Sequence, residues 1–467
     1  MPELAPAYDA SRVEERLYRQ WMERSDYRAN PASPKPSFSI VIPPPNVTGI
    51  LTLGHVLNNT IQDILARRAR LQGKEVLWLP GTDHAGIATQ TVVERTLKKE
   101  GKIKHRDDLG REEFLQQVWQ WKEKHGGIII QQLKKLGASC DWSRERFTMD
   151  PAYSACVQQV FVDLHKKGLI YRGRRMVNWC PVSRTALSDE EVIMKEQRGH
   201  LWHFRVAVEG EKDRFLTIAT TRPETIPGDT AIAVHPKDPR YSSLIGKFAL
   251  RPLPPEQPES GRRIPIVADE HVEMGFGTGV LKVTPAHDPA DFAIGQRHRL
   301  SAIEVIDETG HMNAAAGEKL AGLDRAQARA AAAEQLRELG CLEREEPYTN
   351  QVGFSERADV PVEPRLSEQW FLKYPSAGKS REVVASGRMR FFPERWTKVY
   401  DHWMGNLQDW CISRQLWWGH RIPVWYRGGE TRCQVESPGQ EWTQDPDVLD
   451  TWFSSWLWPF ATMGWPE

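Results

Sequence analysis

The stretch that most constrains the fold is residues 38–79, where two apolar strands flank a helix. "FSIVI" (38–42) and "EVLWL" (75–79) are short apolar runs, and residues 54–72 between them carry apolar side chains at helical spacing. A strand, a helix and a strand in such close succession predict a βαβ unit with parallel strands and a right-handed crossover. We therefore expect an α/β fold built on a Rossmann-like parallel sheet.

A polar loop follows each of the two strands. "PPPNVTG" follows the first, and "PGTDHAG" (80–86) follows the second. Because ligands of open parallel sheets bind beyond the carboxyl ends of the strands, both loops should face one crevice. The helix that begins near residue 54 offers free N–H groups to a phosphate. Asp83 in the second loop has two interpretations: it binds an amino group, or it N-caps the helix that begins near Ile87.

The chain divides into four segments by its composition. They are a leading helix with a proline-rich linker (1–37), the first part of the parallel-sheet domain (38–194), an inserted β-rich α+β domain (195–345) and the second part of the parallel-sheet domain (346–467). Helical periodicity is expected to continue to about residue 175. An Ala-rich stretch predicts a helix over 323–340 at the end of the insert.

The bulk composition excludes several classes of protein. Across 467 residues, 62 Lys and Arg balance 62 Asp and Glu, so any nucleic-acid partner has to be held by local patches. No apolar run approaches the roughly 20 residues of a membrane span, and the first thirty residues lack the apolar core of a signal peptide. The six Cys form no C-x-x-C pair, which argues against a disulfide framework and a zinc site. We expect a cytoplasmic monomer.

Seven sequence blocks carry a resemblance to a known family. They are, in chain order, "PPPNVTGILTLGH", "GTDHAGIATQ", "VNWCPVSRTALSDEEV", "TTRPET", "GTGVLKVTPAHDPADF", "DWCISRQLWWGHRIPVWY" and "DPDVLDTWFSSWLWPF". The blocks resemble those of the valyl-tRNA synthetases, a family of class I aminoacyl-tRNA synthetases, and they cover essentially the whole chain. The isoleucine and leucine enzymes share this plan, and "GTDHAGIATQ" together with the PPPN loop favours valine over isoleucine.

The resemblance implies activation of valine by ATP with Mg²⁺ and transfer of the valyl group to tRNA(Val). "TLGH" (52–55) is similar to the family signature that binds ATP phosphates, with Thr52 in place of the first His. Thr52, Gly54 and His55 are therefore implied to bind ATP, and Thr52 and His55 to be the catalytic pair. Taken alone, a Gly-His pair before a helix favours a structural loop.

The same resemblance implies a valine pocket. Asn46 and Asp83 would hold the α-amino group, and Pro45 and Trp452 would shape the space for the side chain. A rigid proline loop suits the selection of a small apolar side chain. The alternative for Trp452, one of nineteen Trp, is a residue of the core.

The inserted domain resembles an editing domain. A hydrophobic pocket cannot strongly reject an isostere that carries a hydroxyl, a limit for which valine enzymes are a standard example, so mischarged Thr-tRNA has to be hydrolysed. The implied editing residues are Thr220, Arg222, Thr225, Lys282, Thr284, Asp288 and Asp291. Asp291 would anchor the amino group and Asp288 would meet the threonine hydroxyl. Without the family, "HDPAD" predicts an N-capped helix start, and "GFGTG" (275–279) opens no long helix that would favour a dinucleotide site.

The sequence also departs from the family pattern. It contains no K-M-S-K-S-like string, so we expect weak or absent amino acid activation beside a complete editing domain. The alternatives are a freestanding deacylase and a non-catalytic tRNA-binding fragment. A dehydrogenase is excluded because prolines, and no G-x-G-x-x-G, follow the first strand. The basic cluster "YRGRR" (171–175) either touches tRNA phosphates or is a solvated charge run.

Overall fold

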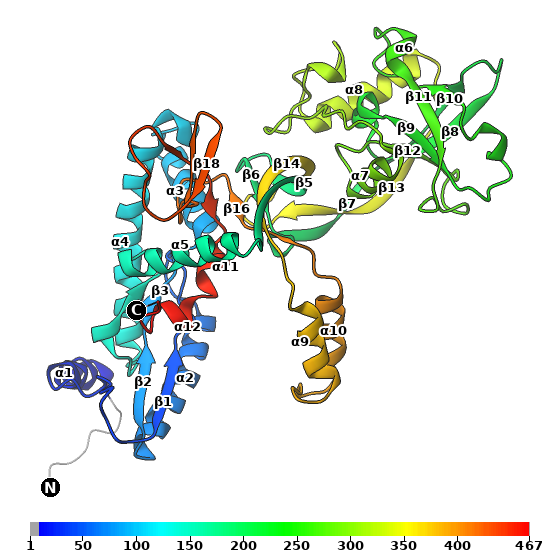
Figure 1. The fold of residues 1–467 in the computed structure, drawn as a ribbon. Coiled ribbons are helices and arrows are strands. Elements are labelled where there is room, and N and C mark those ends of the chain that lie inside the picture. The colour runs from blue at the N-terminus through cyan, green and yellow to red at the C-terminus, as the bar shows by residue number, and fades with distance from the viewer. Residues whose placement is uncertain (1–8, 467) are drawn as a thin grey trace. The chain divides into compact units, whose positions relative to one another are not determined.

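The computed structural model describes residues 9–466, which divide into two compact units (Figure 1). Unit 1 comprises Met1–Tyr171, Leu372–Gly405 and Ile412–Glu467, and unit 2 comprises Arg172–Phe371 and Asn406–Cys411. In the described chain, no helix has both the length and the apolar character needed to cross a membrane.

The predicted βαβ unit is confirmed in unit 1. β1 (Ser37–Val41) and β2 (Glu75–Leu79) pair in parallel, with Phe38 opposite Val76, and α2 (Leu53–Leu71) connects them. Trp78 of β2 is fully buried. Because the strands are parallel, the loops after β1 and β2 leave the sheet at the same edge.

α2 turns its polar side toward the protein and its apolar side outward. An amphipathic helix commonly buries its apolar stripe. Here, Leu57, Ile61 and Ile64 are 65%, 52% and 59% exposed. Arg67 and Arg70 on the inner side donate to the carbonyl oxygens of Gly137 and Ser139, at 2.7 and 2.9 Å. Ala66 and Ala69 are buried on this inner side too, so its contacts combine polar groups with small apolar ones.

Helices make up most of the rest of the N-terminal part of unit 1. They are α1 (Ala10–Glu23), α3 (Gly86–Lys99), α4 (Arg111–Lys135) and α5 (Pro151–Lys166). The predicted leading helix is thus present, and residues 1–8 lie outside the described part. The expectation of helix to about residue 175 is wrong, because Gly168 adopts φ +68° after α5 and β5 (Ile170–Cys180) begins two residues later.

The C-terminal part of unit 1 contains short elements. β16 (Ser413–Arg414) pairs with β20 (Val448–Leu449), and β17 (Val424–Arg427) lies between β18 (Glu430–Cys433) and β19 (Thr443–Gln444). In the N-terminal part of unit 1, β3 (Gly81–Thr82) and β4 (Arg146–Phe147) form a short parallel pair. The helices are α9 (Ala377–Ala385), α10 (Trp396–Gly405), α11 (Thr451–Ser455) and α12 (Trp458–Ala461).

Unit 2 is built on a seven-stranded mixed sheet with its own core. The strands are β7 (Val192–Val208), β8 (Phe215–Thr220), β9 (Ala231–Val234), β10 (Phe248–Leu250), β11 (Arg263–Ala268), β12 (Val280–Val283) and β13 (Leu342–Ser355). β7 and β13 form a long antiparallel ribbon, with Trp202 opposite Glu345. Phe204, Ile232 and Leu336 belong to one cluster of buried apolar residues.

Unit 2 also contains three helices, and a smaller sheet is formed by strands that precede and follow the seven-stranded sheet in sequence. The helices are α6 (Glu259–Arg262), α7 (Pro289–His298) and α8 (Arg325–Glu338). α8 confirms the predicted Ala-rich helix and is capped by Asp324. The four-stranded sheet has the order β15 (Trp410–Cys411), β14 (Glu363–Leu372), β5 and β6 (Thr185–Leu187). The α/β fold with mixed sheets agrees with the predicted fold class.

Candidate functional sites

The N-terminus of α2 has hydrogen-bond donors and an open backbone that suit the binding of an anion. Thr52 precedes the helix, and its N–H donates to His55 Nδ1 at 3.0 Å, while its Oγ1 lies 2.8 Å from the same nitrogen. Because Nδ1 accepts, the proton of the neutral ring is on Nε2, which is then a donor for an incoming oxygen. A Cβ at Gly54 would meet only Thr52 Oγ1, at 3.7 Å, so the backbone is open to close approach.

The two loops after β1 and β2 are tied together by their backbones. Asp83 N–H donates to Pro45 O at 2.9 Å, and Val47 N–H donates to Asp83 O at 3.1 Å. Asn46 and Asp83 therefore form an isolated parallel bridge. The structure thus brings Pro45, Asn46 and Asp83 together, with Pro45 buried and Asn46 exposed.

Asp83 is a buried carboxylate held by neutral donors. It is 3% exposed, and Oδ1 accepts from Ala85 N–H at 2.6 Å while Oδ2 accepts from Ser455 Oγ at 2.7 Å. Burial raises the pKa of Asp83 to about 6, against the lowering effect of these two hydrogen bonds. Among residues 9–466, no Lys or Arg forms an ion pair with it. The N-cap of α3 is Ala85, at φ +49°, so the capping alternative for Asp83 is not observed.

Ser455 belongs to α11, the same short helix as Trp452. Asp450 caps this helix by accepting from Trp452 N–H at 2.8 Å, and it forms a buried ion pair with Arg414. Trp452 is 66% exposed, so the structure does not place it in the core. Three positions separate it from Ser455, which puts both on neighbouring turns of one side of the helix. No sequence motif singles out Ser455, although the SS pair after Trp452 offers two hydroxyls.

The histidine beside Asp83 is a residue of the interior. His84 is fully buried, and its Nδ1 lies 2.8 Å from Thr148 Oγ1. Its ring packs edge-on against His420 with centroids 5.1 Å apart, and burial lowers the pKa of each to about 3. Both rings are therefore neutral at physiological pH. They add no charge to the wall behind Asp83.

A second polar cluster lies in unit 2 around Lys282. Lys282 of β12 donates from Nζ to Thr225 Oγ1 at 2.9 Å, and the same nitrogen lies 3.3 Å from Asp229 Oδ1. Thr284 donates through Oγ1 to Asp229 and through its N–H to Asp291 Oδ2, the latter at 2.8 Å. Thr225, Lys282, Thr284 and Asp291 thus converge, as the sequence predicts for a common site. Asp229 joins them, although no sequence motif indicates it.

The two aspartates of "HDPAD" have different surroundings. Asp288 is exposed and caps α7, accepting from Ala290 N–H at 2.8 Å and Asp291 N–H at 3.1 Å through Oδ1. The helix-start interpretation therefore holds for this residue. Asp291 is buried, which raises its pKa to about 7, while Lys282 opposes and Asp288 reinforces that shift. When the pKa of a carboxyl group lies near neutral pH, a bound cation shifts the group toward its ionised form.

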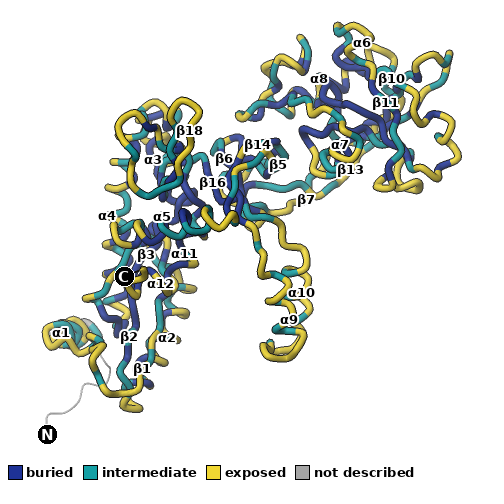
Figure 2. The backbone as a smooth tube through the Cα atoms, viewed as in Figure 1, coloured by how far each residue is buried: buried dark blue, intermediate teal, exposed yellow. Residues whose placement is uncertain are grey.

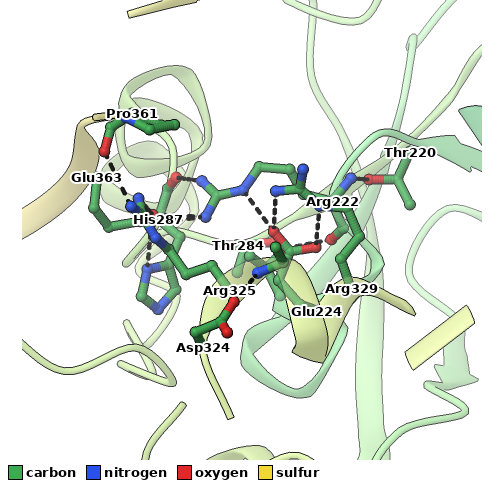
Figure 3. A network of polar contacts seen from close by, with 12 residues as sticks. Thr220, Arg222, Glu224, Thr284, His287, Asp324, Arg325, Arg329, Pro361 and Glu363 are labelled. Atoms are coloured by element: carbon green, nitrogen blue, oxygen red, sulfur yellow. Dashed lines mark hydrogen bonds and ion pairs between the residues drawn. The ribbon is translucent and has the colours of Figure 1, made fainter. Parts of the chain in front are cut away.

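Arg222 stands at the centre of an ion-pair network (Figure 3). Its guanidinium donates to both oxygens of Glu363, at 2.7 and 2.9 Å, and to Glu224 at 3.2 Å and His287 O at 3.2 Å. Arg329 binds Glu224 through two further hydrogen bonds, and Arg325 binds Glu363 at 3.1 Å. Thr220 is attached at the edge, where its Oγ1 accepts from Arg222 N–H at 3.0 Å.

The network fixes the charge states of its members. Burial alone would raise the pKa of Glu363, but Arg222 and the neighbouring His287 and Arg325 lower it to about 2. Burial would lower the pKa of Arg222, and Glu363 and Glu224 reverse the direction and raise it. Since most of its N–H groups are used within the protein, Arg222 holds its neighbours in place more than it reaches for a ligand. The glutamates and arginines around it are separated in sequence and carry no local motif.

The basic cluster at 171–175 is paired with carboxylates. Arg172 lies 3.1 Å from Glu368 and Arg175 lies 3.1 Å from Asp409. Arg174 pairs with Glu304. The cluster is thus neutralised within the protein. Among residues 9–466, no group of three or more His, Cys, Asp or Glu is arranged to hold a metal ion.

Comparison with known proteins gives consistent matches. The family model for tRNA synthetases class I (I, L, M and V) matches residues 16–442 and 429–467. The valine–tRNA ligase of Geobacter sulfurreducens is 54% identical over 475 residues, and that of Syntrophotalea carbinolica is 53% identical over 476 residues; each match covers 100% of the chain and 52% of the relative. The valine–tRNA ligase of Chlorobaculum tepidum is 55% identical over 438 residues, with 92% of the chain and 47% of the relative covered. The chain spans about half the length of the curated relatives it matches.

Proposed function

The chain belongs to the class I tRNA synthetases of the I, L, M and V group, and from this premise we propose that it carries the activation and editing sites of a valine–tRNA ligase. In the proposed reaction, the valine carboxylate attacks the α-phosphorus of ATP, and pyrophosphate leaves. A hydroxyl of the 3′-terminal ribose of tRNA(Val) then attacks the carbonyl carbon of the adenylate, and AMP leaves. ATP is expected as its Mg²⁺ complex. Such chemistry depends on positioning and charge stabilisation more than on a protein nucleophile.

The N-terminus of α2 would bind the nucleotide phosphates. The N–H groups of its first turn carry partial positive charge, and His55 Nε2–H adds a side-chain donor; the Thr52 hydroxyl, 2.8 Å from His55 Nδ1, would donate to a phosphate by turning away from that nitrogen. The hydrogen bond from Thr52 N–H to His55 Nδ1 keeps the ring in the tautomer that donates from Nε2. Gly54 leaves the backbone accessible.

The single observation that carries the amino acid assignment is the environment of Asp83. Asp83 is a buried carboxylate that accepts from two neutral donors and has no cationic partner among the described residues. A bound ammonium group would supply the missing counter-charge. Asn46 lies beside it and offers a second polar contact. Pro45 and the exposed ring of Trp452 would bound the valine side chain, and the rigid proline loop would resist expansion for larger residues.

The cluster around Lys282 would hydrolyse Thr-tRNA(Val). Asp291 would receive the threonyl ammonium, and Asp288, with Oδ2 not engaged in the cap, would accept from the threonine hydroxyl. Lys282 would stabilise negative charge that develops on the ester as water attacks, and Thr225, whose hydroxyl accepts from Lys282 and donates to Arg222 O, would hold Lys282 in place. Arg222 and Thr220 would maintain this arrangement through the ion-pair network. The burial of Lys282 among Thr225, Asp229 and Thr284 supports this role.

Two measurements test the proposal. Isothermal titration with non-hydrolysable adenylate analogues of valine, threonine and isoleucine should give tight binding of the valine and threonine analogues and weak binding of the isoleucine analogue. A deacylation assay with Thr-tRNA(Val) and Val-tRNA(Val) should show hydrolysis of the former only. Tightest binding of the isoleucine analogue would exclude valine specificity, and the absence of deacylation with intact Thr-tRNA(Val) would exclude the editing role. Valine-dependent pyrophosphate exchange then measures whether this chain completes activation, which the sequence predicts to be weak.

A further inference from the structure

The helical hairpin of α9 and α10 contains no buried residue (Figure 2). Its two helices contact each other through Tyr400, whose hydroxyl donates to Ser380 O at 3.3 Å and whose ring packs against Phe391 at 5.1 Å between centroids. Arg381 of α9 and Asp401 of α10 add an ion pair at 2.8 Å. The side of α10 that carries Tyr400 is thus occupied by α9.

Next to the side that carries Tyr400, α10 presents an apolar stripe to solvent. Phe392, Trp396, Val399 and Trp403 are 87%, 47%, 43% and 57% exposed. Trp396, Val399 and Trp403 are three and four residues apart in α10 and so lie along one helical face, while Phe392 lies in the loop before the helix. Exposed aromatic side chains gathered in this way are unusual on a monomeric protein surface and mark sites of interaction.

Basic residues border the stripe. The hairpin, residues 377–405, contains six basic residues, Lys379, Arg381, Arg388, Arg390, Arg395 and Lys398, and three acidic residues, Glu382, Glu394 and Asp401. The hairpin is therefore positive in a chain whose net charge is zero. Among these six, within the described chain, only Arg381 forms an ion pair with a carboxylate. Arg395 and Lys398 are spaced by three residues next to the stripe, and the Arg395 guanidinium lies 5.4 Å from the Trp396 ring centroid.

We infer that this face of the hairpin binds RNA, with unpaired bases stacked on the aromatic stripe and phosphates beside Arg395 and Lys398. Aromatic platforms bordered by basic side chains are how proteins hold single-stranded nucleic acid. An anionic membrane would satisfy the charges, but only an RNA also offers flat faces to the two Trp rings. The inference rests on the proposed function, because the RNA expected here is the tRNA substrate.

Fluorescence anisotropy with the complete chain and a labelled tRNA(Val) transcript tests the inference. The double variant Trp396→Ala/Trp403→Ala should weaken binding about tenfold or more, since stacking on each ring contributes substantially per base. Arg395→Glu/Lys398→Glu should weaken binding and also lower the slope of log Kd against log salt concentration by about 1.4, the value for two lost phosphate contacts. A matched control, Lys212→Glu/Phe215→Ala, replaces an exposed lysine and a 45% exposed aromatic residue on another surface and should leave Kd unchanged.

A conservative variant and a vesicle assay distinguish base stacking from membrane binding. Trp396→Phe/Trp403→Phe should restore affinity, because a smaller ring still stacks, whereas loss of affinity in this variant would overturn the inference. The inference would also be overturned if Trp396→Ala/Trp403→Ala bound tRNA(Val) with wild-type affinity. It would be overturned in favour of a membrane if this variant lost binding to anionic phosphatidylserine vesicles but kept its affinity for RNA. Binding of the valyl-adenylate analogue is measured in parallel. If the chain binds RNA through the hairpin but does not bind the analogue, the RNA-binding surface is supported and the proposed valine site is refuted. If it binds the analogue but does not bind RNA through the hairpin, the valine site is supported and the RNA-binding surface is refuted.

Discussion

Asp83 in unit 1 and Asp291 in unit 2 are both buried carboxylates with raised pKa values, and each is proposed to receive the α-amino group of an amino acid. Their surroundings differ. Asp83 is held by two neutral donors, Ala85 N–H and Ser455 Oγ. Asp291 lies in a field of opposing charges, with Lys282 lowering and Asp288 raising its pKa. Burial is the largest cause of the raised pKa at both residues, so the difference lies in the neighbours: neutral donors surround Asp83, and charged groups surround Asp291.

The largest expected effect tests the dependence of unit 2 on its ion pairs. Glu363→Gln leaves the Arg222 guanidinium without its principal partner in a buried setting, so the free energy of unfolding of unit 2 should fall by about 3–5 kcal/mol. Urea denaturation followed by hydrogen exchange in α8 and β9 measures this. The control is Glu209→Gln at the exposed pair with Arg263, which should cost less than about 1 kcal/mol. Equal losses in the two variants would contradict the dependence of unit 2 on its buried ion pairs.

Exchanging the two carboxylates for amides separates the sites. Asp83→Asn should weaken binding of the valyl-adenylate analogue by about 2–5 kcal/mol, because an ammonium group would lose its buried counter-charge. Asp291→Asn should reduce kcat/KM for Thr-tRNA(Val) deacylation and leave analogue binding unchanged. Titration calorimetry and deacylation kinetics are measured on both variants. If either substitution impaired both activities alike, the assignment of one carboxylate to each site would be wrong.

The residues that position these groups should have smaller effects. Ser455→Ala removes a hydrogen bond to a buried carboxylate, worth about 1.5–3 kcal/mol, and should raise the Kd for the valyl-adenylate analogue roughly tenfold or more. Asp229→Asn should lower kcat for deacylation by roughly ten- to hundredfold with little change in KM, because Lys282 loses its partner at 3.3 Å. Ser455→Thr retains the hydroxyl and serves as the control for the first variant. A rise in KM alone for Asp229→Asn would argue for substrate contact in place of positioning.

The smallest effect is a difference in pH dependence between the two sites. Both carboxylates have to be ionised to hold an ammonium group. Affinity for the valyl-adenylate analogue should therefore fall about tenfold per pH unit below about pH 6, where Asp83 becomes protonated. Deacylation should begin to fall nearer pH 7, where Asp291 does. Profiles that decline at the same pH would show that the two environments do not separate the carboxylates.

The pKa of Asp83 also sets the sign of its contribution to stability. Since its folded-state pKa lies above the ordinary value of 3.8, the folded protein binds the proton more tightly than the unfolded chain. Its stabilising contribution is present at low pH and is lost as pH rises from about 4 to about 6. At neutral pH, the ionised Asp83 therefore lowers the free energy of unfolding, as expected of a buried group whose role is to bind a ligand.

The sequence predicts those features that depend on neighbours along the chain. The βαβ unit and the Ala-rich helix follow from local periodicity, and the cap at Asp288 follows from "HDPAD". Ser455 escapes prediction because it meets Asp83 across 372 positions, and Asp229 meets Lys282 across 53. The end of α5 also escapes prediction, because the apolar pattern of residues 169–180 suits a strand as well as a helix, and Gly168 decides between them.

The outward apolar side of α2 shows a different limit. Periodicity identifies the helix and its stripe, but which side faces the protein depends on whether Arg67 and Arg70 find acceptors at Gly137 and Ser139. Such pairings are not encoded in the stripe itself.

The two backbone hydrogen bonds between Pro45, Val47 and Asp83 have a consequence for redesign. They couple the loop that leads into α2 to the segment that carries the buried carboxylate, so neither can shift without stretching the other. Engineering the proposed amino acid pocket for a larger substrate by moving the proline loop would therefore also disturb the proposed phosphate site at the N-terminus of α2. A change of substrate preference would be accompanied by an altered KM for ATP.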